Sequence, residues 1–455
     1  MHTSPEFDAD VLVVGGGVIG TAIAWRAALA GRSVTIIDPG TDDKASLVAA
    51  GMLGPVSESV FGERDLLGLN LHALDRFGSF SAELEAASGQ RTGLRTEGTL
   101  AVAYDNDDLA ALDRLTEFRH SIGLTARRLT ARECRRLEPF LAPSIRGGVL
   151  ATGDRSVDNR RYLAALRAAA VKAGVRQLTG TVTSVRAGAG QATVHARLAR
   201  APVPAPAPAP ATAPAPALSA APSTPIEDVD GAADSMRTSA DGARPDITAR
   251  DVVIIAARDV VIAAGWATGS IEGLPDEIRK AIRPVKGQIL RLRHPAPLSP
   301  PAMPLIASHT IRATVAGRDI YLVPREDGEL VVGATQEERG DRDVTAGAVY
   351  ELLRDATTAL PVISELILAE ASAGLRPGTS DNGPILGLIG TRHPTGTGGP
   401  VSTRHPVGTG GLIIATGHFR NGILLSAATA DAVVALLAGQ APHRAWAPFG
   451  PGRLA

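Results

Sequence analysis

The stretch "DVLVVGGGVIG", residues 10–20, decides the fold class of this chain. A run of strand-forming residues leads into a glycine-rich turn, and the helical pattern "TAIAWRAALAG" (21–31) follows directly. A second apolar run, "SVTIID" (33–38), has the composition of another buried strand. This order predicts a strand, a helix and a parallel strand, which is the repeating unit of a doubly wound α/β sheet.

The glycine turn has the spacing of a dinucleotide-binding site. Gly15, Gly17 and Gly20 permit a tight turn, close approach of the backbone to a pyrophosphate and close helix packing. Asp38 ends the second strand, where a carboxylate can accept hydrogen bonds from a ribose and would repel a 2′-phosphate. The pattern predicts a dinucleotide site but does not by itself distinguish FAD from NAD.

Composition narrows the classes of partner. With 455 residues and a formal net charge of −1, the chain has no overall positive field for nucleic acid or an acidic membrane, so we expect neither partner. The single cysteine, Cys134, cannot form an internal disulfide, and the histidines lack metal-ligand spacing, so we expect no metal site. No signal sequence precedes residue 10, and Arg258 and Asp259 interrupt the apolar run at 252–264 well short of a membrane span. We expect a soluble, cytoplasmic protein.

Later segments predict a second domain. Residues 98–104, 287–293, 320–324 and 329–335 alternate apolar and polar side chains, as in an antiparallel sheet with one buried face. The predicted fold class is α/β, a Rossmann-like FAD-binding domain interleaved with an antiparallel-sheet substrate domain. The discontinuous first domain comprises residues 8–88, 147–199, 248–280 and 374–442. The substrate domain comprises 89–146 and 281–373.

Three segments differ in character from these domains. Residues 200–247 are rich in alanine, proline and small polar residues, which predicts a disordered insertion. Two short duplications, 249–256 with 257–264 and 391–399 with 403–411, have no solenoid period. We expect both to be local expansions in surface loops or at a hairpin tip.

Three motifs identify a family. "ASLVAAGML" (45–53), "LRPGTSDNGPILG" (375–387) and "GHFRNGILL" (417–425) together resemble the D-amino-acid-oxidase family of flavoenzymes, and most of all its FAD-dependent glycine oxidases of thiamine biosynthesis. The similarity extends over nearly the whole chain apart from the insertion, and includes "RPVKGQILRL" (283–292) and "LVVGAT" (330–335). The resemblance implies FAD as the cofactor and a small amino acid and molecular oxygen as substrates. It further implies a homo-oligomer, a tetramer in this family, and a hand-off of product to thiazole synthase.

The resemblance assigns cofactor contacts to four segments. Those to the ADP half are implied for Gly15, Gly17, Val18, Ile19, Gly20, Asp38 and Pro39. The middle of FAD would lie against Ala45, Ser46, Ala50, Gly51 and Met52, and the adenine side against the backbone of Val182. The flavin ring would lie beside His418, Phe419, Arg420, Asn421, Gly422, Ile423 and Leu424. Asn421 and Gly422 are predicted to open a helix whose positive end favours negative charge on a reduced flavin.

Substrate contacts are implied for three residues. Arg376 matches the family's carboxylate anchor, whose guanidinium can form two parallel hydrogen bonds with a carboxylate. Tyr321 matches a hydroxyl that bonds the same carboxylate, and Arg420 matches a second positive group near substrate and flavin. Gln336 replaces a methionine of the best-known members, which changes the polarity of the pocket. Cys134 lies in a polar helix far from the motifs, so FAD is expected to be bound non-covalently.

The residues leave several functions open. The leading hypothesis is oxidation of glycine to the imine and then glyoxylate, with ammonia and hydrogen peroxide as further products. A broader D-amino-acid or sarcosine oxidase shares the same chemistry. A quinone-linked amino-acid dehydrogenase would differ in its electron acceptor, and a flavin-binding partner protein would show no turnover.

Overall fold

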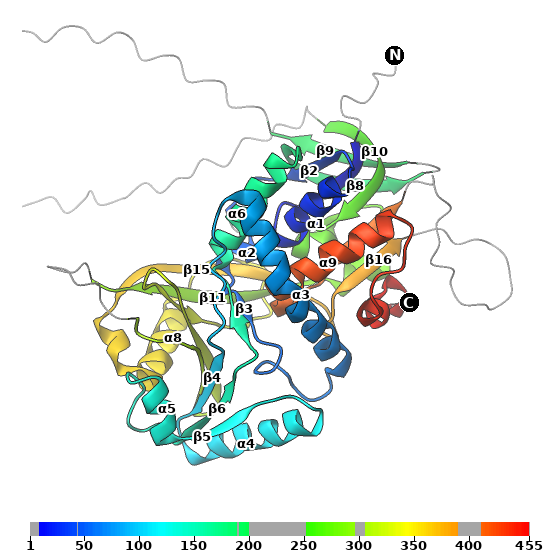
Figure 1. Ribbon diagram of the computed structural model, residues 1–455. Coiled ribbons are helices and arrows are strands. Elements are labelled where there is room, and N and C mark those ends of the chain that lie inside the picture. Colours follow the sequence, from blue (N-terminus) through cyan, green and yellow to red (C-terminus); the bar gives the residue numbers. More distant parts are fainter. Residues whose placement is uncertain are drawn as a thin grey trace, which may run out of the picture.

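The computed structural model describes residues 9–42, 44–188, 191–199, 252–295, 305–389 and 411–454. The predicted insertion, 200–247, and nearly all of the second duplication, 391–411, lie outside the described residues. The described chain forms two lobes, each built on its own sheet, and the long strands β11 (Arg283–Arg293) and β15 (Ile367–Gly378) run between them (Figure 1).

Within the described residues, seven strands form the sheet of the first lobe. The predicted unit is confirmed: β1 (Ala9–Val14) leads into α1 (Val18–Leu29), and β2 (Val34–Asp38) returns parallel to β1. The apolar runs of these strands are buried because helices and loops cover both faces of a parallel sheet. The remaining strands are β8 (Arg176–Ala187), β9 (Ala192–Leu198), β10 (Val252–Ile262), β16 (Ile385–Ile389) and β17 (Leu412–Thr416).

The sequence led us to expect the first duplication in a surface loop or at a hairpin tip, and this prediction is wrong. Residues 252–262 form the single strand β10. Its first half pairs antiparallel with β9, and its second half pairs parallel with β1 and β17. The apolar, β-branched residues of both copies are compatible with one extended strand, so the repetition lengthened the strand instead of forming a turn.

One face of the first sheet is covered by helices that pack on each other. The apolar helix α9 (Gly422–Leu437) lies beside α1, with α3 (Arg64–Ser88) and α6 (Asn159–Lys172) next to them (Figure 1). Among the described residues, one helical segment, Phe419–Leu437, is long and apolar enough to cross a membrane, yet 61% of it is buried inside the protein. The apolar composition of this segment is therefore explained by its position in the core of the first lobe. Further α-helices of this lobe are α2 (Ala45–Val48) and α7 (Asp276–Ala281).

In the described chain, eight strands form the sheet of the second lobe. Their spatial order is β15, β11, β14 (Leu330–Gly333), β13 (Arg318–Pro324), β12 (Thr310–Val315), β4 (Thr99–Ala103), β6 (Gly147–Ala151) and β5 (Arg127–Thr130). Neighbouring strands are antiparallel except β4 and β12, which are parallel. The helices are α4 (Asn106–Ser121), α5 (Ala131–Leu137) and α8 (Ala346–Ala359).

The predicted domain boundary at residue 147 differs from the sheet pairing. Strand β6 follows this boundary, yet it lies between β4 and β5 in the second sheet. The chain returns to the first lobe after the short ribbon of β3 (Met52–Leu53) and β7 (Arg155–Ser156). An apolar run such as "GGVLA" fits either sheet, and only pairing with distant strands decides between them.

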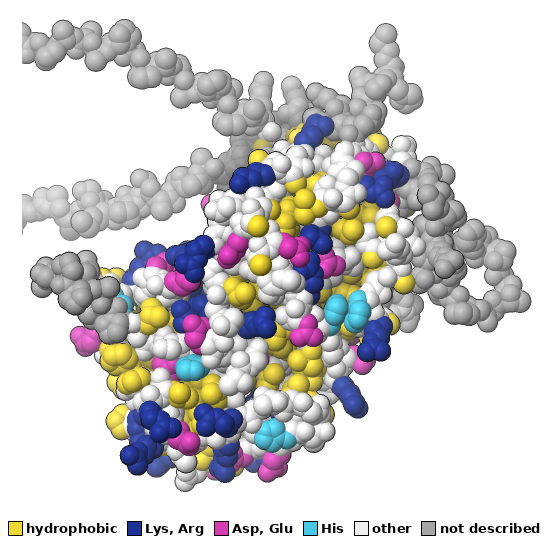
Figure 2. Space-filling view, viewed as in Figure 1, with side chains coloured by type: hydrophobic (Ala, Val, Ile, Leu, Met, Phe, Trp, Pro, Cys, Tyr) yellow, Lys and Arg dark blue, Asp and Glu magenta, His cyan; other side chains and the backbone are white. Residues whose placement is uncertain are grey.

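Charges of both signs are interspersed over the face seen in Figure 2. Dark blue lysine and arginine side chains alternate with magenta aspartate and glutamate side chains across both lobes. This mixed pattern agrees with a formal net charge of −1 for the whole chain.

Candidate functional site

A cavity of about 1040 Å³ lies between the two lobes. On one side it is lined by residues at the carboxyl ends of β1, β2, β10 and β17, and on the other by β11, β12, β13 and β15. Ligands of open α/β sheets bind at the carboxyl ends of the strands. The volume is at the upper end of the range of roughly 300 to 1,000 Å³ that is usual for ligand pockets. The cavity is therefore the candidate active site.

The glycine turn forms one end of the cavity. Gly15 has a φ of +108°, and a Cβ added there would lie 2.4 Å from the carbonyl oxygen of Ala263, so only glycine fits. A Cβ on Gly20 would lie 1.9 Å from the carbonyl oxygen of Gly15, so this glycine permits the helix to pack on the turn. Gly17 and the first residues of α1 line the cavity itself.

Asp38 is held at the same end by three groups. Its carboxylate accepts hydrogen bonds from the backbone N–H of Gly16 at 2.7 Å and of Gly40 at 2.8 Å. Lys44 Nζ lies 2.9 Å from Asp38 Oδ1 and also lines the cavity. Sequence reasoning missed Lys44, whose positive charge offsets the negative charge that was expected to repel a 2′-phosphate.

Two helices point their N-terminal ends into this cavity. Among the described residues, neither Gly17 at the start of α1 nor Asn421 at the start of α9 forms a side-chain cap, and neither first turn contains an acidic residue. The positive dipole end of each helix thus faces the cavity and favours a negatively charged ligand there. Ser46 accepts a hydrogen bond from Val18 N at 3.0 Å, which places its hydroxyl beside the first turn of α1.

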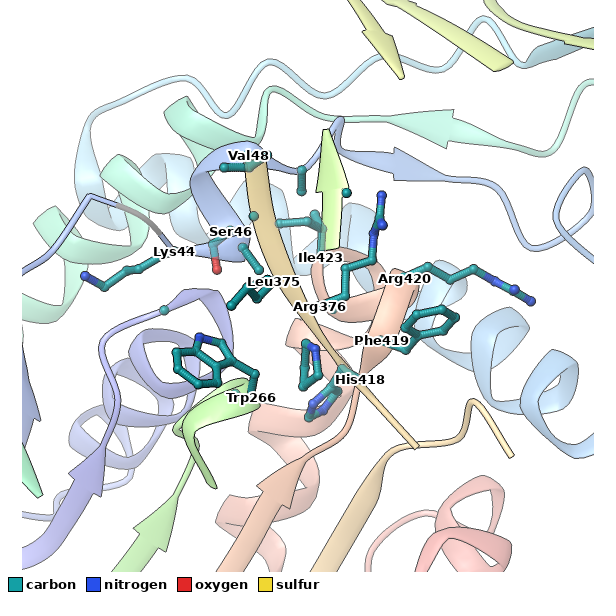
Figure 3. Close-up of a pocket in the computed structure, with 18 of the residues that line it drawn as sticks. Lys44, Ser46, Val48, Trp266, Leu375, Arg376, His418, Phe419, Arg420 and Ile423 are labelled. Atoms are coloured by element: carbon teal, nitrogen blue, oxygen red, sulfur yellow. The ribbon is translucent and has the colours of Figure 1, made fainter. Parts of the chain in front are cut away.

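The residues predicted to lie along the middle of the cofactor also line the cavity. Ala45, Ser46, Ala50, Gly51 and Met52 come from α2 and the segment that follows it. Gly51 has a φ of +76°, and a Cβ there would lie 2.0 Å from the carbonyl oxygen of Val157. Pro39 and Val182 line the end nearest to the glycine turn. In Figure 3, Lys44 and Ser46 lie on one side of the pocket and Phe419 and Arg420 on the other.

The segment between β17 and α9 brings a buried histidine to the cavity. His418 Nε2 lies 3.0 Å from Thr429 Oγ1, and burial lowers the pKa of His418 to about 3, so the ring is neutral at physiological pH. Phe419 has a φ of +45°, which is unusual for a bulky residue and turns the chain into α9. Gly422 and Ile423, the first residues of the helix, line the cavity.

Three of the predicted cofactor residues do not line the cavity. Gly20 serves the packing of α1 on its turn, and Leu424 is buried in the core of the first lobe. Asn421 is only 3% exposed, and its Nδ2 atom has no hydrogen-bond partner among the described residues. The remaining predicted residues, Gly15, Gly17, Val18, Ile19, Asp38, Pro39, Ala45, Ser46, Ala50, Gly51, Met52, Val182, His418, Phe419, Arg420, Gly422 and Ile423, line it.

Arg376 and Tyr321 meet at the opposite end of the cavity, on β15 and β13. The Arg376 guanidinium donates to the backbone carbonyls of Thr335 at 3.2 Å and Lys286 at 3.5 Å. Within the described ranges, no carboxylate lies within ion-pair distance of it. Burial raises the pKa of the Tyr321 phenol, and the charge of Arg376 acts in the opposite direction. The pair offers a cation and a hydroxyl to an anionic ligand.

Two glycines make room for these side chains. A Cβ added to Gly287 on β11 would lie 2.2 Å from Arg376 Nη1. A Cβ added to Gly333 on β14 would lie 2.4 Å from the hydroxyl of Tyr321. Arg376 and Tyr321 therefore lie over glycines of neighbouring strands, which restricts where each polar group can be.

Arg420 is arranged differently from Arg376. Its Nη2 atom lies 2.5 Å from Glu63 Oε2, and its guanidinium lies 5.8 Å from the ring centre of Phe419. In Figure 3 the side chains of Arg376 and Arg420 extend in different directions. The positive charge expected beside the substrate thus already has a carboxylate partner in the protein.

Sequence reasoning missed several polar residues of the cavity wall. Trp266 lies at the wall with the Arg342 guanidinium 5.2 Å from its ring centre. Glu58 and Arg312 form an ion pair at 3.0 Å near Tyr321. None of these residues stands in a motif of fixed spacing, and the partners come from distant parts of the chain. Gln336, predicted to change the polarity of the pocket, does line it.

Comparison with known proteins shows which family the chain resembles over most of its length. The family described as FAD dependent oxidoreductase matches residues 10–208 and 221–436. The glycine oxidase of Geobacillus kaustophilus is 30% identical over 97% of this chain and 96% of its own length. The bifunctional protein ThiO/ThiG of Synechocystis sp. is 28% identical over 98% of this chain, which spans 54% of that relative, or about half its length.

Solved structures agree with the sequence comparison. The crystal structure of glycine oxidase from Geobacillus kaustophilus superposes with a TM-score of 0.72 at 28% identity, covering 97% of this chain and 98% of that one. Iminodiacetate oxidase from Chelativorans sp. superposes with a TM-score of 0.70 at 22% identity, covering 97% and 99%. At this lower identity the likeness shows the fold alone.

Proposed function

The chain belongs to the FAD dependent oxidoreductase family, and from that premise we propose that it oxidises glycine and related small amino acids in the cavity between its lobes. The products would be the imine, which hydrolyses to glyoxylate and ammonia, and hydrogen peroxide from oxygen. When bound, FAD supplies the capacity to accept two electrons from the carbon–nitrogen bond and to pass them to an acceptor. The likeness to a glycine oxidase over nearly the full length of both proteins supports the choice of glycine.

The residues at the glycine-turn end fit an ADP-containing cofactor. Gly15 and Gly17 bring the backbone close to the cavity, and the positive dipole end of α1 would face a pyrophosphate. Asp38 would accept hydrogen bonds from the ribose. The start of α9 would stabilise negative charge near the flavin ring. This wall of the cavity is therefore proposed as the FAD site.

We expect FAD to be held without a covalent bond. Cys134 is the only cysteine in the sequence, and it is buried in the core of the second lobe and away from the cavity. Burial raises the pKa of its thiol to about 11, so it is a poor nucleophile. Denaturation should release a yellow chromophore into the supernatant. A colour that remained with the precipitated protein would contradict this expectation.

The observation that carries the proposed substrate class is the Arg376 guanidinium, which faces the cavity and, among the described residues, bonds backbone carbonyls and the Tyr321 side chain but no carboxylate. A partly buried cation without a carboxylate partner among the described residues is suited to the carboxylate of an amino acid. Tyr321 would donate a further hydrogen bond. The substrate's α-carbon would thereby be held in a fixed orientation, which is the main contribution that the protein makes to this type of reaction.

Relative rates test the proposal and its alternatives. The purified yellow protein should consume oxygen and produce peroxide with glycine, and the rates on sarcosine and D-alanine define how broad its specificity is. Turnover of D-alanine far above glycine would favour a broader D-amino-acid oxidase. Reduction of a quinone without oxygen uptake would identify a dehydrogenase instead.

Two partner assignments belong to the same proposal. A hand-off of product to thiazole synthase is supported by the similarity to a bifunctional protein that extends beyond this chain. Assembly as a tetramer is the family expectation, and light scattering of the purified protein tests it.

A further inference from the structure

Glycine carries an ammonium group as well as a carboxylate, so a site that binds the zwitterion benefits from an anion as well as a cation. Several carboxylates line the cavity within the described chain: Asp38, Glu58, Glu272 and Asp319. Asp38 already accepts a hydrogen bond from the glycine turn. Glu272 lies at the end of the cavity away from Tyr321, where the Glu272 backbone forms hydrogen bonds with β8. Asp319 is exposed. Glu58 is the half-buried carboxylate of the substrate end.

Glu58 is near the proposed carboxylate anchors. Its partner Arg312 lies directly opposite Tyr321 in the pairing of β12 with β13, so these two side chains share a face of the sheet. The charges of Glu58, Arg312 and Arg376 all act on the Tyr321 phenol. The end of the cavity that contains the cation Arg376 therefore also contains an anion.

The Glu58 carboxylate has one oxygen available. Arg312 Nη1 donates to Glu58 Oε1 at 3.0 Å, which holds the side chain in place. Within the described part of the chain, Oε2 has no hydrogen-bond partner. Its side chain is 13% exposed, so a ligand in the cavity and not bulk solvent would be its main partner.

Two buried charges fix the backbone on both sides of Glu58. Asp154, which is fully buried, accepts hydrogen bonds from Val56 N and Ser57 N at 3.0 Å each. Arg119, only 3% exposed, donates to Ser57 O at 2.8 Å and to Ser59 Oγ at 3.2 Å. Burial of ionised groups is costly unless they are hydrogen-bonded, and here both are used to hold one short loop. This is the arrangement of a preorganised binding residue.

We propose that Glu58, oriented by Arg312, binds the amino group of the substrate while Arg376 and Tyr321 bind its carboxylate. The inference rests on the proposed function because it assumes an amino-acid substrate. It makes Glu58 a substrate-binding residue that distinguishes an amino acid from the corresponding hydroxy acid. Glycolate, which has a hydroxyl in place of the ammonium, is the matched probe.

The test compares glycine with glycolate on holoenzyme containing Glu58→Gln. Loss of one charge-assisted hydrogen bond should raise the KM for glycine about tenfold, with a much smaller change in kcat. The Kd for glycolate, measured by calorimetry, should stay within about threefold of wild type or decrease, because a released Arg312 can attract an anion. Glu58→Asp keeps the charge and should recover part of the glycine affinity.

Two controls separate recognition of the amine from general disturbance. The double variant Glu58→Gln/Arg312→Met removes both charges and should bind glycine as weakly while binding glycolate as wild type does. Glu83→Gln removes a glutamate of α3 that pairs with Arg26 on α1 and Arg76 on α3, away from the cavity, and should change the affinity for neither ligand. Equal weakening of glycine and glycolate by Glu58→Gln, or a glycine affinity within about threefold of wild type, would overturn the proposal.

Turnover of glycine by the wild type is measured first and tests the proposed function on its own. If the wild type does not oxidise glycine, calorimetric titration with glycine and glycolate still tests Glu58 by the same comparison. Failure of the function and failure of the amine-binding role are therefore distinguishable.

Discussion

Gly287 lies directly against the guanidinium of Arg376, and a Cβ added to this glycine would lie 2.2 Å from Arg376 Nη1. Gly287→Ala should therefore displace the guanidinium and reduce kcat/KM for glycine about tenfold. Folding and flavin content should change little, because the clash is with the flexible end of a side chain in a regular strand. Steady-state oxygen uptake and the flavin spectrum measure both effects.

Gly347 supplies the matched control for this change. It lies in α8, and an added Cβ there meets no atom within 4 Å. Gly347→Ala should leave the kinetics unchanged. Wild-type kinetics in Gly287→Ala would show that Arg376 need not occupy its present position.

Arg420 and Arg376 should differ in importance. Glu63 already neutralises the charge of Arg420. The fold-loss of kcat/KM in Arg420→Ala should therefore be at least about tenfold smaller than the fold-loss in Arg376→Ala. Part of its effect should come from the unpaired Glu63, so adding Glu63→Gln should recover some of the loss. An equal or larger loss in Arg420→Ala than in Arg376→Ala would reverse the assignment of the anchor.

Acid should destabilise the protein partly through His418. Burial lowers its folded-state pKa from 6.5 to about 3, so between these values the unfolded chain binds more protons than the folded one. The free energy of unfolding must then decrease as pH falls below 6.5, by up to about 2 kcal/mol at pH 5. His418→Gln should show a smaller decrease in Tm from pH 7.5 to 5 than wild type does. Equal decreases would show that His418 does not contribute.

Deletion of residues 201–247 should leave flavin content and turnover within about twofold of wild type. Arg197 on β9 pairs with Val252 on β10, so the strands that flank the insertion are already neighbours and can close as a hairpin. Flavin absorbance per protein and oxygen uptake measure the outcome. A soluble deletion variant that has lost its flavin would contradict this expectation.

Local patterns predicted the parts of the fold that depend on local chemistry. The glycine turn before α1 and the start of α9 at Gly422 are set by backbone geometry and side-chain periodicity, which a sequence displays directly. The place of β6 in the second sheet and the continuity of β10 depend on pairing with distant strands. Apolar residues do not specify which strand will be the neighbour.

The charged pairs of the cavity could not be predicted for a related reason. Arg420 and Glu63 are separated by 357 positions, and Arg312 and Glu58 by 254. Each partner alone has the sequence context of an ordinary charged residue on a helix, strand or loop. The resemblance assigned Arg420 to the substrate, and only the folded chain reveals that a glutamate is already its partner.

The most direct test of the account measures oxygen uptake with glycine in wild type, Arg376→Ala and Arg376→Lys, with the flavin absorbance of each. Loss of the charged, hydrogen-bonded anchor should reduce kcat/KM about a hundredfold or more in Arg376→Ala, because charge-assisted hydrogen bonds contribute about 1.5 to 3 kcal/mol each. Lysine should recover only part, since it keeps the charge but not the planar fork that orients the carboxylate. All three proteins should retain FAD. Activity of Arg376→Ala within about threefold of wild type, with flavin retained, would contradict the assignment of Arg376 as the substrate's anchor.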